Sequence, residues 1–424
     1  MQRRHFLQTG SALGAMGLVS GCATMGGGSG PKVVVIGGGY AGATAAKYLR
    51  MWSEHKIQVT LVEPSDAFIS CPMSNLVIGG SKTITEITTP YDNLTKRHGV
   101  KIIKDRVNTI DADKRIVKLA GGTELTYDRL IVSPGVDFMW ETLPGMNKAG
   151  AKDKVMHAWK AGAQTLTLRK QLEAMPDGGV FAMSIPLAPY RCPPGPYERA
   201  CQVAEYFSKA KPKSKVLVLD ANDDVTSKGP LFKKAWAERY KGIVEYRGKH
   251  RVTDVDAATN TLKFEFNDDV KANVLNVIPN MRAGDIAVNA GLATANKRWC
   301  EVDFLTFESK AAKNVHVLGD SIQVAPGMPK SGHMANQHGK TCAAAVVALL
   351  MGKQVNPMPI YNNTCYSYVS SKDVVHVASV HRFDAEKKTM LTVPGSGGVS
   401  TAANELEGVY AWSWAQNIWA DTLA

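Results

Sequence analysis

The feature that most constrains how this chain can fold is a glycine-rich turn near its N-terminus. Residues 33–36 are a β-branched run typical of a buried parallel strand. The turn after it carries the G-x-G-x-x-G spacing through Gly37, Gly39 and Gly42, and a small-residue helix is expected over residues 41–51. In a dinucleotide-binding βαβ unit, the first glycine permits the tight turn, the second lets a pyrophosphate approach the backbone, and the third lets helix and strand pack closely. We therefore predict that these glycines bind a dinucleotide.

The next strand supports this interpretation. Residues 58–62 form a second strand that ends at Glu63, about 20 residues beyond the glycines, where a ribose hydroxyl needs an acceptor. The N-terminus of the intervening helix would offer free N–H groups and the positive end of its dipole to the phosphates. Glu63 is therefore the predicted ribose-binding residue.

Length and composition limit the class of protein. A chain of 424 residues is too long for one ordinary core, so two or three domains are expected. Hydrophobic residues make up 45% and charged residues 21%, as in globular proteins. The net charge of +12 could suit an anionic membrane or an acidic protein, but no basic run is interleaved with aromatic residues, which disfavours nucleic acid.

Residues 1–30 are predicted to be an export signal and tether. Arg3 and Arg4 precede an uncharged stretch rich in Gly and Ala, as in twin-arginine signals, so the expected compartment is the periplasm. Residues 19–22 also resemble a lipobox, in which Cys22 would become the lipidated first residue of the mature protein. Ordinary cleavage nearby, with Cys22 discarded, is the alternative.

A cysteine follows the first unit closely. Cys71 lies beside Pro72 in a segment expected to be an irregular loop that returns toward the nucleotide crevice, where it could lie against a bound cofactor. The alternative is a small buried hydrophobic residue.

A second βαβ pattern begins near residue 180, with strands over 180–183 and 216–219 and a helix over 198–210. The turn between them has lost the glycine spacing and contains five prolines, at positions 186, 189, 193, 194 and 196. Prolines contribute no N–H group, so this turn cannot cradle a pyrophosphate on successive amides. A pyridine nucleotide is therefore disfavoured as the electron donor.

The same turn presents a thiol. Cys192 has Arg191 beside it and Glu198 in the following helix. A nearby cation lowers the pKa of a thiol, which would raise the thiolate fraction of Cys192. A stiff proline-rich connector with an inert cysteine is the alternative.

The last third of the chain supplies further candidate residues. A strand over 315–320 delivers Gly319 and Asp320 at its C-terminal end, where ligands bind in doubly wound sheets, and Asp320 could accept hydrogen bonds from a flavin ribityl chain. Lys330 precedes a helix whose N-terminus would stabilise negative charge on a reduced flavin. Cys365 is expected in a loop of the C-terminal region.

Cysteine spacing excludes several metal sites. There is no C-x-x-C pair and no Cys/His ligand spacing, so zinc and iron–sulfur sites are not expected. Without C-x-x-C-H, no c-type haem is expected on this chain. Cys201 and Cys342 fall in apolar helical patterns and are predicted to be inert, and Cys300 follows no recognisable motif.

Several longer segments share their sequence with a known family. They are residues 37–39 with 42–48, Cys71 with 74–75 and 77–80, 157–162, 191–200, 328–332 and 363–367. Through these segments the chain resembles the flavoprotein subunit of flavocytochrome c sulfide dehydrogenase and related flavoproteins of sulfur oxidation. The resemblance covers the whole mature chain, and the run over residues 191–200 is its most specific part. Pro72 is a departure, because family members often have an aromatic residue there.

The resemblance implies a chemistry. Cys71 would carry FAD through a thioether to the flavin 8α-methyl group, and Cys192 and Cys365 would form a redox disulfide beside the isoalloxazine. Glu198 would act as acid or base. Sulfide would be oxidised to sulfur or polysulfide, and the electrons would pass to a separate haem c subunit in a heterodimer.

The resemblance also implies a domain plan of the disulfide-reductase type, α/β with two dinucleotide-binding-type domains and a small α+β C-terminal domain. Residues 31–155 and 280–355 would form the FAD domain, 156–279 an NADH-domain-like lobe without the glycine motif, and 356–424 a C-terminal interface domain. Two other functions remain open: an NAD(P)H-dependent flavin reductase of the same fold, and a non-catalytic flavoprotein that assists a sulfur-oxidation complex.

Overall fold

The glycine-rich turn lies at the edge of a five-stranded parallel sheet. In the computed structural model, which describes residues 30–424, this sheet has the order β19-β9-β1-β2-β5. Its strands are β1 (Lys32–Ile36), β2 (Gln58–Val62), β5 (Lys101–Ile103), β9 (Arg129–Val132) and β19 (Val315–Val317). Since β1 pairs in parallel with both β2 and β9, the carboxyl ends of the three strands meet at one edge, where a nucleotide is expected.

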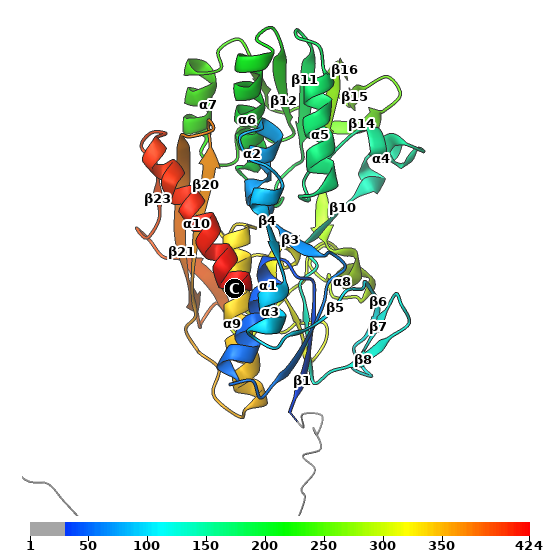
Figure 1. Cartoon of the computed structure of the whole chain (residues 1–424), viewed down its shortest axis with the longest axis vertical. Coiled ribbons are helices and arrows are strands. Elements are labelled where there is room, and N and C mark those ends of the chain that lie inside the picture. The colour runs from blue at the N-terminus through cyan, green and yellow to red at the C-terminus, as the bar shows by residue number, and fades with distance from the viewer. Residues whose placement is uncertain (1–29) are drawn as a thin grey trace, which may run out of the picture. The chain divides into compact units, whose positions relative to one another are not determined.

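Two helices pack closely beside this sheet. Helix α1 (Tyr40–Trp52) follows the glycine turn, and α9 (Gly332–Leu350) lies against it, as Figure 1 shows in blue and yellow-orange. A Cβ atom at Gly339 of α9 would lie 2.5 Å from the carbonyl oxygen of Ala41. The small residues predicted for α1 therefore serve close contact between helices, as in other tightly packed pairs.

The second βαβ pattern forms a four-stranded parallel sheet of order β13-β12-β11-β17, which confirms the α/β fold class. Helix α6 starts at Gly195, three residues before the predicted start at 198, because Pro196 is well suited to the first turn of a helix. The elements are α5 (Ala163–Ala174), β11 (Val180–Ile185), α6 (Gly195–Ala210), β12 (Lys215–Asp220), α7 (Gly229–Glu238), β13 (Val244–Arg247) and β17 (Val274–Val277).

The segment after β2 crosses from the first sheet to the helices of the second. Helix α2 (Ser74–Gly79) packs against α5 and α6, and Figure 1 shows it in blue among the green helices. Cys71 lies just before it in a 3-10 turn, η1 (Cys71–Met73), and not in the predicted irregular loop. The Ser74 hydroxyl donates a hydrogen bond of 2.7 Å to the carbonyl of Cys71, which closes this turn.

The C-terminal region is an antiparallel sheet followed by a long helix. It contains β20 (Ile360–Tyr368), β21 (Val374–Asp384), β22 (Thr389–Thr392), β23 (Gly398–Val399) and α10 (Glu405–Leu423). Strand β20 contacts both α6 and α9, so it joins the two parallel sheets along the side shown in orange and red in Figure 1. The prediction of a loop around Cys365 is wrong. Cys365 lies inside β20 opposite Val377, because full-length pairing with β21 overrides the weak strand propensity of its polar neighbours.

Smaller elements complete the described chain. They are β3 (Ala67–Ile69), η2 (Thr85–Ile87), β4 (Thr88–Pro90), α3 (Asp92–Lys96), β6 (Val107–Asp111), β7 (Ile116–Leu119), β8 (Glu124–Thr126), β10 (Val136–Phe138), η3 (Trp140–Thr142), η4 (Pro144–Asn147), α4 (Ala151–Lys154), β14 (Val252–Asp256), β15 (Thr261–Phe264), β16 (Val270–Lys271), β18 (Met281–Ala283), α8 (Asp285–Asn289) and η5 (Gly319–Ser321).

Residues 31–424 form one compact unit, so the division into an FAD domain, a second lobe and a C-terminal domain stays a prediction. The predicted export signal and Cys22 lie outside the described residues. Within residues 30–424, no helix combines the length and the apolar character needed to cross a membrane.

Candidate functional site

A cavity of about 380 Å³ runs from the glycine turn of the first sheet to the proline-rich turn of the second. Its volume is typical of a small-molecule or cofactor site. It brings together most of the site residues predicted from sequence. The predicted residues that line it are Gly37, Gly39, Glu63, Cys71, Cys192, Glu198, Gly319, Asp320 and Cys365. Gly42 and Lys330 do not line it.

At the end of the cavity formed by the glycine turn, Gly39 and Gly42 have different surroundings, and each fits its predicted role. A Cβ atom at Gly39 would have no neighbour within 4 Å, so this backbone is open to the cavity. A Cβ atom at Gly42 would lie 1.9 Å from the carbonyl oxygen of Gly37, so Gly42 is needed for packing of the helix on the turn. Glu63 accepts hydrogen bonds from the backbone N–H groups of Gly38, at 2.7 Å, and Ser65, at 2.8 Å, which hold its carboxylate at the cavity.

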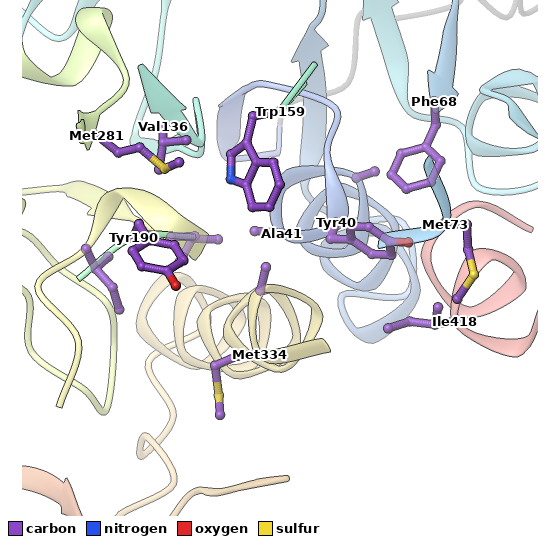
Figure 2. Close-up of a cluster of buried hydrophobic side chains, with 14 of the residues drawn as sticks. Tyr40, Ala41, Phe68, Met73, Val136, Trp159, Tyr190, Met281, Met334 and Ile418 are labelled. Atoms are coloured by element: carbon purple, nitrogen blue, oxygen red, sulfur yellow. The ribbon is translucent and has the colours of Figure 1, made fainter. Parts of the chain in front are cut away.

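Aromatic side chains form the middle of the cavity wall. Figure 2 shows the rings of Tyr40 and Trp159 on either side of Ala41, with Phe68 beyond Tyr40. The rings of Tyr40 and Phe68 meet edge to face, with centroids 4.9 Å apart. The indole N–H of Trp159 donates to the carbonyl of Arg191 at 3.2 Å, which ties this wall to the proline-rich turn. Such a wall suits a flat, largely apolar ring system.

Two thiols from distant segments lie at the other end. Cys192 has a left-handed backbone with φ of 58°, and its N–H donates to the carbonyl of Lys330 at 2.9 Å. Cys365 reaches the same cavity from β20, and its sulfur accepts a hydrogen bond of 3.3 Å from the Asn363 amide. Both cysteines have free thiols in this structure. Left-handed residues other than glycine are strained, and such strain clusters at functional sites.

Arg191 lowers the pKa of the Cys192 thiol, as predicted, but the expected gain in thiolate does not follow, because burial outweighs this effect. Burial raises the pKa of Cys192 to about 12, and the charges of Cys365 and Glu198 raise it further, while Arg191 and Lys228 lower it only in part. The thiolate of Cys192 is therefore a minor form at neutral pH. The sequence shows that a cation is adjacent, but not that the thiol is desolvated.

Glu198 is buried and points at the thiol end of the cavity, with 4% of its surface exposed. Its carboxylate accepts hydrogen bonds of 2.8 Å from the side chain of Asn75 and from the backbone of Tyr368. Burial raises the pKa of Glu198 to about 7, and these two hydrogen bonds lower it only in part. A carboxyl group that titrates near neutral pH can both accept and donate a proton there.

Arg199, which we did not predict as a site residue, lies between Glu198 and the aromatic wall. It is fully buried, and its guanidinium donates to Asn75 at 2.9 Å and stacks over Trp159 at 4.8 Å. Burial lowers the pKa of Arg199 to about 9, so it remains a cation at neutral pH. Its membership of the specific run over residues 191–200 was the only signal in the sequence.

Of the two predicted residues Asp320 and Lys330, Asp320 lines the cavity and Lys330 does not. The ammonium of Lys330 points away from the cavity, donating to the carbonyls of Asp320 at 2.9 Å and Ile322 at 2.5 Å and lying 3.6 Å over the ring of Trp299. Burial lowers its pKa to about 7. Lys330 thus supports the loop that carries Asp320. Asp320 does line the cavity, and burial raises its pKa, while the charges of Arg191 and Lys330 lower it in part.

The second sheet has no free acid for a nucleotide ribose at the end of its second strand. Asp220 is fully buried there, and its carboxylate accepts hydrogen bonds from the hydroxyls of Tyr197 at 2.7 Å and Tyr246 at 3.0 Å. The protein's own tyrosines therefore satisfy the group that would bind a ribose in a nucleotide domain. This supports the interpretation that the second lobe does not bind a pyridine nucleotide.

The cavity residues fit a flavin dinucleotide. Besides the open backbone at Gly39, two buried donors that line the cavity, an Nη of Arg191 and the indole N–H of Trp414, have no hydrogen-bond partner within residues 30–424. Buried donors in proteins are almost always paired, so these two suit acceptors on a bound molecule. Over the same residues, no cluster of three or more His, Cys, Asp or Glu side chains is arranged to hold a metal ion.

Comparison with known proteins identifies the family. Residues 165–279 match the sequence model described as "Sulfide dehydrogenase [flavocytochrome c] flavoprotein chain, central", and 357–423 match "Flavocytochrome c sulphide dehydrogenase, flavin-binding". Residues 31–173 match "Pyridine nucleotide-disulphide oxidoreductase". The sulfide dehydrogenase flavoprotein chain from Chlorobaculum thiosulfatiphilum is 59% identical over 46 residues, which cover 94% of that sequence and 11% of this chain.

This chain belongs to the flavocytochrome c sulfide dehydrogenase flavoprotein family. The family is one of sulfide-oxidising flavoproteins, and its flavin-binding region implies FAD as the cofactor. The chain is also 26% identical over 300 residues to a mitochondrial sulfide:quinone oxidoreductase from Dictyostelium discoideum. That match covers 68% of this chain and 65% of the relative.

Comparison with solved structures shows that this chain has a disulfide-reductase-like flavoprotein fold. The sulfide:quinone oxidoreductase from Aquifex aeolicus superposes with a TM-score of 0.74 at 18% identity, over 92% of this chain and 91% of that one. The putidaredoxin reductase–putidaredoxin complex gives 0.66 at 16% identity, over 91% and 93%. At these identities the likeness concerns the fold alone.

Proposed function

We propose that this protein is the flavoprotein subunit of a sulfide:cytochrome c oxidoreductase that uses Cys192 and Cys365 as a redox disulfide. The observation that carries the proposal is that these two cysteines, 173 positions apart in sequence (365 − 192), line one cavity together with Glu198. Disulfide chemistry needs two thiols and a site for proton exchange, and this end of the cavity offers both. The family match and the closed nucleotide site of the second lobe support the proposal.

The first step is thiol–disulfide exchange. Hydrosulfide attacks one sulfur of a Cys192–Cys365 disulfide, so that a new S–S bond forms as the old one breaks. One cysteine then carries a persulfide, the other leaves as a thiolate, and the proton of hydrosulfide is released. When the persulfide and the thiolate together lose two electrons, the disulfide re-forms and one sulfur atom leaves at the oxidation state of elemental sulfur.

The cofactor would be held by the glycine turn, Glu63 and Asp320, with Cys71 in position for a covalent bond. Bound FAD would accept two electrons from sulfur and return them singly to haem, as flavins do. Cys71 lines the cavity, and its sulfur accepts a hydrogen bond of 3.3 Å from the backbone N–H of Ala161. We propose a thioether between Cys71 and the flavin on this basis and on the family resemblance.

Charged and dipolar groups of the chain would stabilise the sulfur anions. Ser331 caps helix α9 by accepting a hydrogen bond from the Met334 N–H at 3.0 Å, and the first residues of α9, Gly332 and His333, line the cavity. The positive end of this helix dipole would therefore favour an anion bound in the cavity. Glu198 would take up the proton released from hydrosulfide. Arg191 and Arg199 add positive charge to the same wall.

The electron acceptor and the compartment are further parts of the proposal. The family resemblance leads us to propose a haem c subunit that forms a heterodimer with this chain. Residues 1–30 lead us to propose export to the periplasm by the twin-arginine route. Cys22 would be a lipid anchor where it is retained. Turnover tests the acceptor: sulfide should reduce an added c-type cytochrome but not a soluble ubiquinone analogue. Turnover with the quinone alone would contradict the cytochrome part of the proposal.

A further inference from the structure

A buried lysine outside the cavity contacts the segment that carries Cys365. Lys228 comes from the loop before α7, and 8% of its surface is exposed. Its ammonium donates to the carbonyl of Cys365 at 2.9 Å, to the hydroxyl of Ser367 at 2.7 Å and to the carbonyl of Val375 at 3.4 Å. The cation is therefore fixed behind the strand that presents one of the two redox thiols.

The ammonium group of Lys228 is bound by neutral acceptors. All three groups that accept hydrogen bonds from Lys228 among residues 30–424 are neutral, two carbonyls and one hydroxyl. The titratable groups that face it are Cys365, Glu198 and Cys192, and more weakly Glu407. Glu198 is only partly ionised near neutral pH, since its pKa is about 7. A buried cation favours a nearby anion.

The backbone of Lys228 supports a dedicated role. Its φ of 56° is left-handed, a conformation that residues other than glycine adopt at a cost in free energy. The backbone N–H groups of Leu231 and Phe232 both donate to its carbonyl at 3.1 Å, so the start of α7 holds this conformation. Strain that is held in place by surrounding contacts is typical of functional positions.

The two thiols differ in how well they could carry a negative charge. The sulfur of Cys365 accepts a hydrogen bond from Asn363, and Lys228 is the largest influence that lowers the pKa of this buried thiol. The sulfur of Cys192 accepts no hydrogen bond from the residues that the structure describes, and it lies within van der Waals reach of Gly195, where an added Cβ would be 2.9 Å away. Arg191 and Lys228 also lower the pKa of Cys192, but of the two thiols Cys365 has the hydrogen bond to its sulfur and the contact of Lys228 with its own backbone.

We infer that Lys228 is the buried counter-cation of the Cys365 thiolate, and that it makes Cys365 the thiol that carries the negative charge when the pair is reduced. Lys228 is a positioning residue, because it acts through Cys365 and does not reach the cavity. Ionisation of Cys365 breaks only its S–H bond, and the proton leaves to solvent. The inference deepens the proposed function, since it concerns the same pair of thiols.

Alkylation of the reduced holoprotein tests the inference without sulfide or an electron acceptor. The rate at which iodoacetamide labels Cys365 is measured against pH by mass spectrometry of its peptide, which distinguishes it from Cys192. In Lys228→Met the midpoint of this profile should rise by about one pH unit or more, because a close opposite charge has been removed. Below the midpoint, the labelling of Cys365 should then be about tenfold slower. Lys228→Arg, which keeps the charge, should restore most of the rate.

Lys47→Met is the matched control. Lys47 is also buried, with 7% exposed, and donates to two backbone carbonyls, those of Ala420 and Asp421, both at 3.0 Å. Its replacement should lower stability without moving the Cys365 profile. An unchanged profile in a folded Lys228→Met protein overturns the inference. Because the labelling experiment uses no sulfide, its result can be interpreted even if the wild-type protein does not oxidise sulfide.

A reciprocal measurement serves if Lys228→Met does not fold. Coupling between two ionisable groups is mutual, so loss of the thiolate must alter the titration of the lysine by the same free energy. In Cys365→Ser, the titration midpoint of Lys228 should fall, as followed by NMR of lysines labelled with ¹³C at Cε. No change between the wild type and Cys365→Ser would contradict the inference.

Discussion

The amide of Asn75 donates a hydrogen bond of 2.8 Å to the carboxylate of Glu198, although 123 positions separate them, and both side chains are buried. The same amide accepts a hydrogen bond of 2.9 Å from the guanidinium of Arg199. One side chain of helix α2 thus positions the carboxyl group of Glu198 and the guanidinium cation of Arg199 on helix α6. The proton-exchanging group of the proposed mechanism is therefore built at the contact between these two helices.

Replacing Glu198 by Gln should flatten the pH dependence of stability between about pH 4.5 and 7. In the folded state the pKa of Glu198 is about 7, above its ordinary value, so the folded protein keeps a proton that the unfolded chain loses. The free energy of unfolding then falls as pH rises through this window, by at most about 1.4 kcal/mol per pH unit from this group. Urea unfolding at several pH values measures the slope. Glu205→Gln, on the same helix, should keep the wild-type slope, and an unchanged slope in Glu198→Gln would contradict the account.

Gly39→Ala should lower FAD content, whereas Gly42→Ala should lower the stability of the fold. Gly39→Ala meets no atom within 4 Å, and its φ of −71° suits any residue, so the melting temperature should stay close to that of the wild type while FAD content falls. Gly42→Ala must displace the backbone of Gly37, and overpacking of this kind costs about 1–3 kcal/mol or more. Thermal melts and flavin absorbance check both variants. Full FAD content in Gly39→Ala would show that this backbone does not contact the cofactor.

Replacing either Cys192 or Cys365 by Ser should abolish reduction of the flavin by sulfide while the bound flavin remains. Serine cannot form the disulfide that sulfide attacks, and each side chain lies at the cavity wall, not in the core. Cys201→Ser is the control, because Cys201 is fully buried in α6 and does not line the cavity. Wild-type rates in Cys365→Ser would refute the disulfide mechanism.

Replacing Cys71 by Ser should release the flavin on acid denaturation. If a thioether joins Cys71 to the cofactor, the wild-type flavin stays with the precipitated protein, whereas the flavin of the variant passes into the supernatant. Flavin fluorescence of the two fractions measures this. Free flavin from the denatured wild type would contradict the covalent bond.

Local patterns predicted much of this fold. The turn at Gly37, the strand before it and the helix after it follow from glycine spacing and hydrophobic pattern, which act over a few residues. The five prolines on the two sides of Cys192 likewise indicated a second lobe without a pyrophosphate cradle. Glu63 and Asp320, predicted from the ends of strands, line the cavity, whereas Lys330, predicted from a helix start, does not.

The remainder depends on contacts between distant segments. Cys365 lies in a strand because β20 pairs with β21, and Lys228 reaches it only through the packing of the loop before α7 on β20. The high pKa of Cys192 reflects burial, which no local pattern reports. Sequence proximity of Arg191 to Cys192 therefore gave the direction of one contribution to this pKa but not of the net shift.

The central claim is that sulfide, and not NADH, reduces the flavin of this protein. The most direct measurement is anaerobic flavin absorbance on the purified protein, with sulfide in one cuvette and NADH in another. We predict bleaching by sulfide alone, with the colour restored by an oxidised c-type cytochrome. Bleaching by NADH would contradict the interpretation of the second lobe, and a yellow protein that neither donor bleaches would point to an accessory flavoprotein.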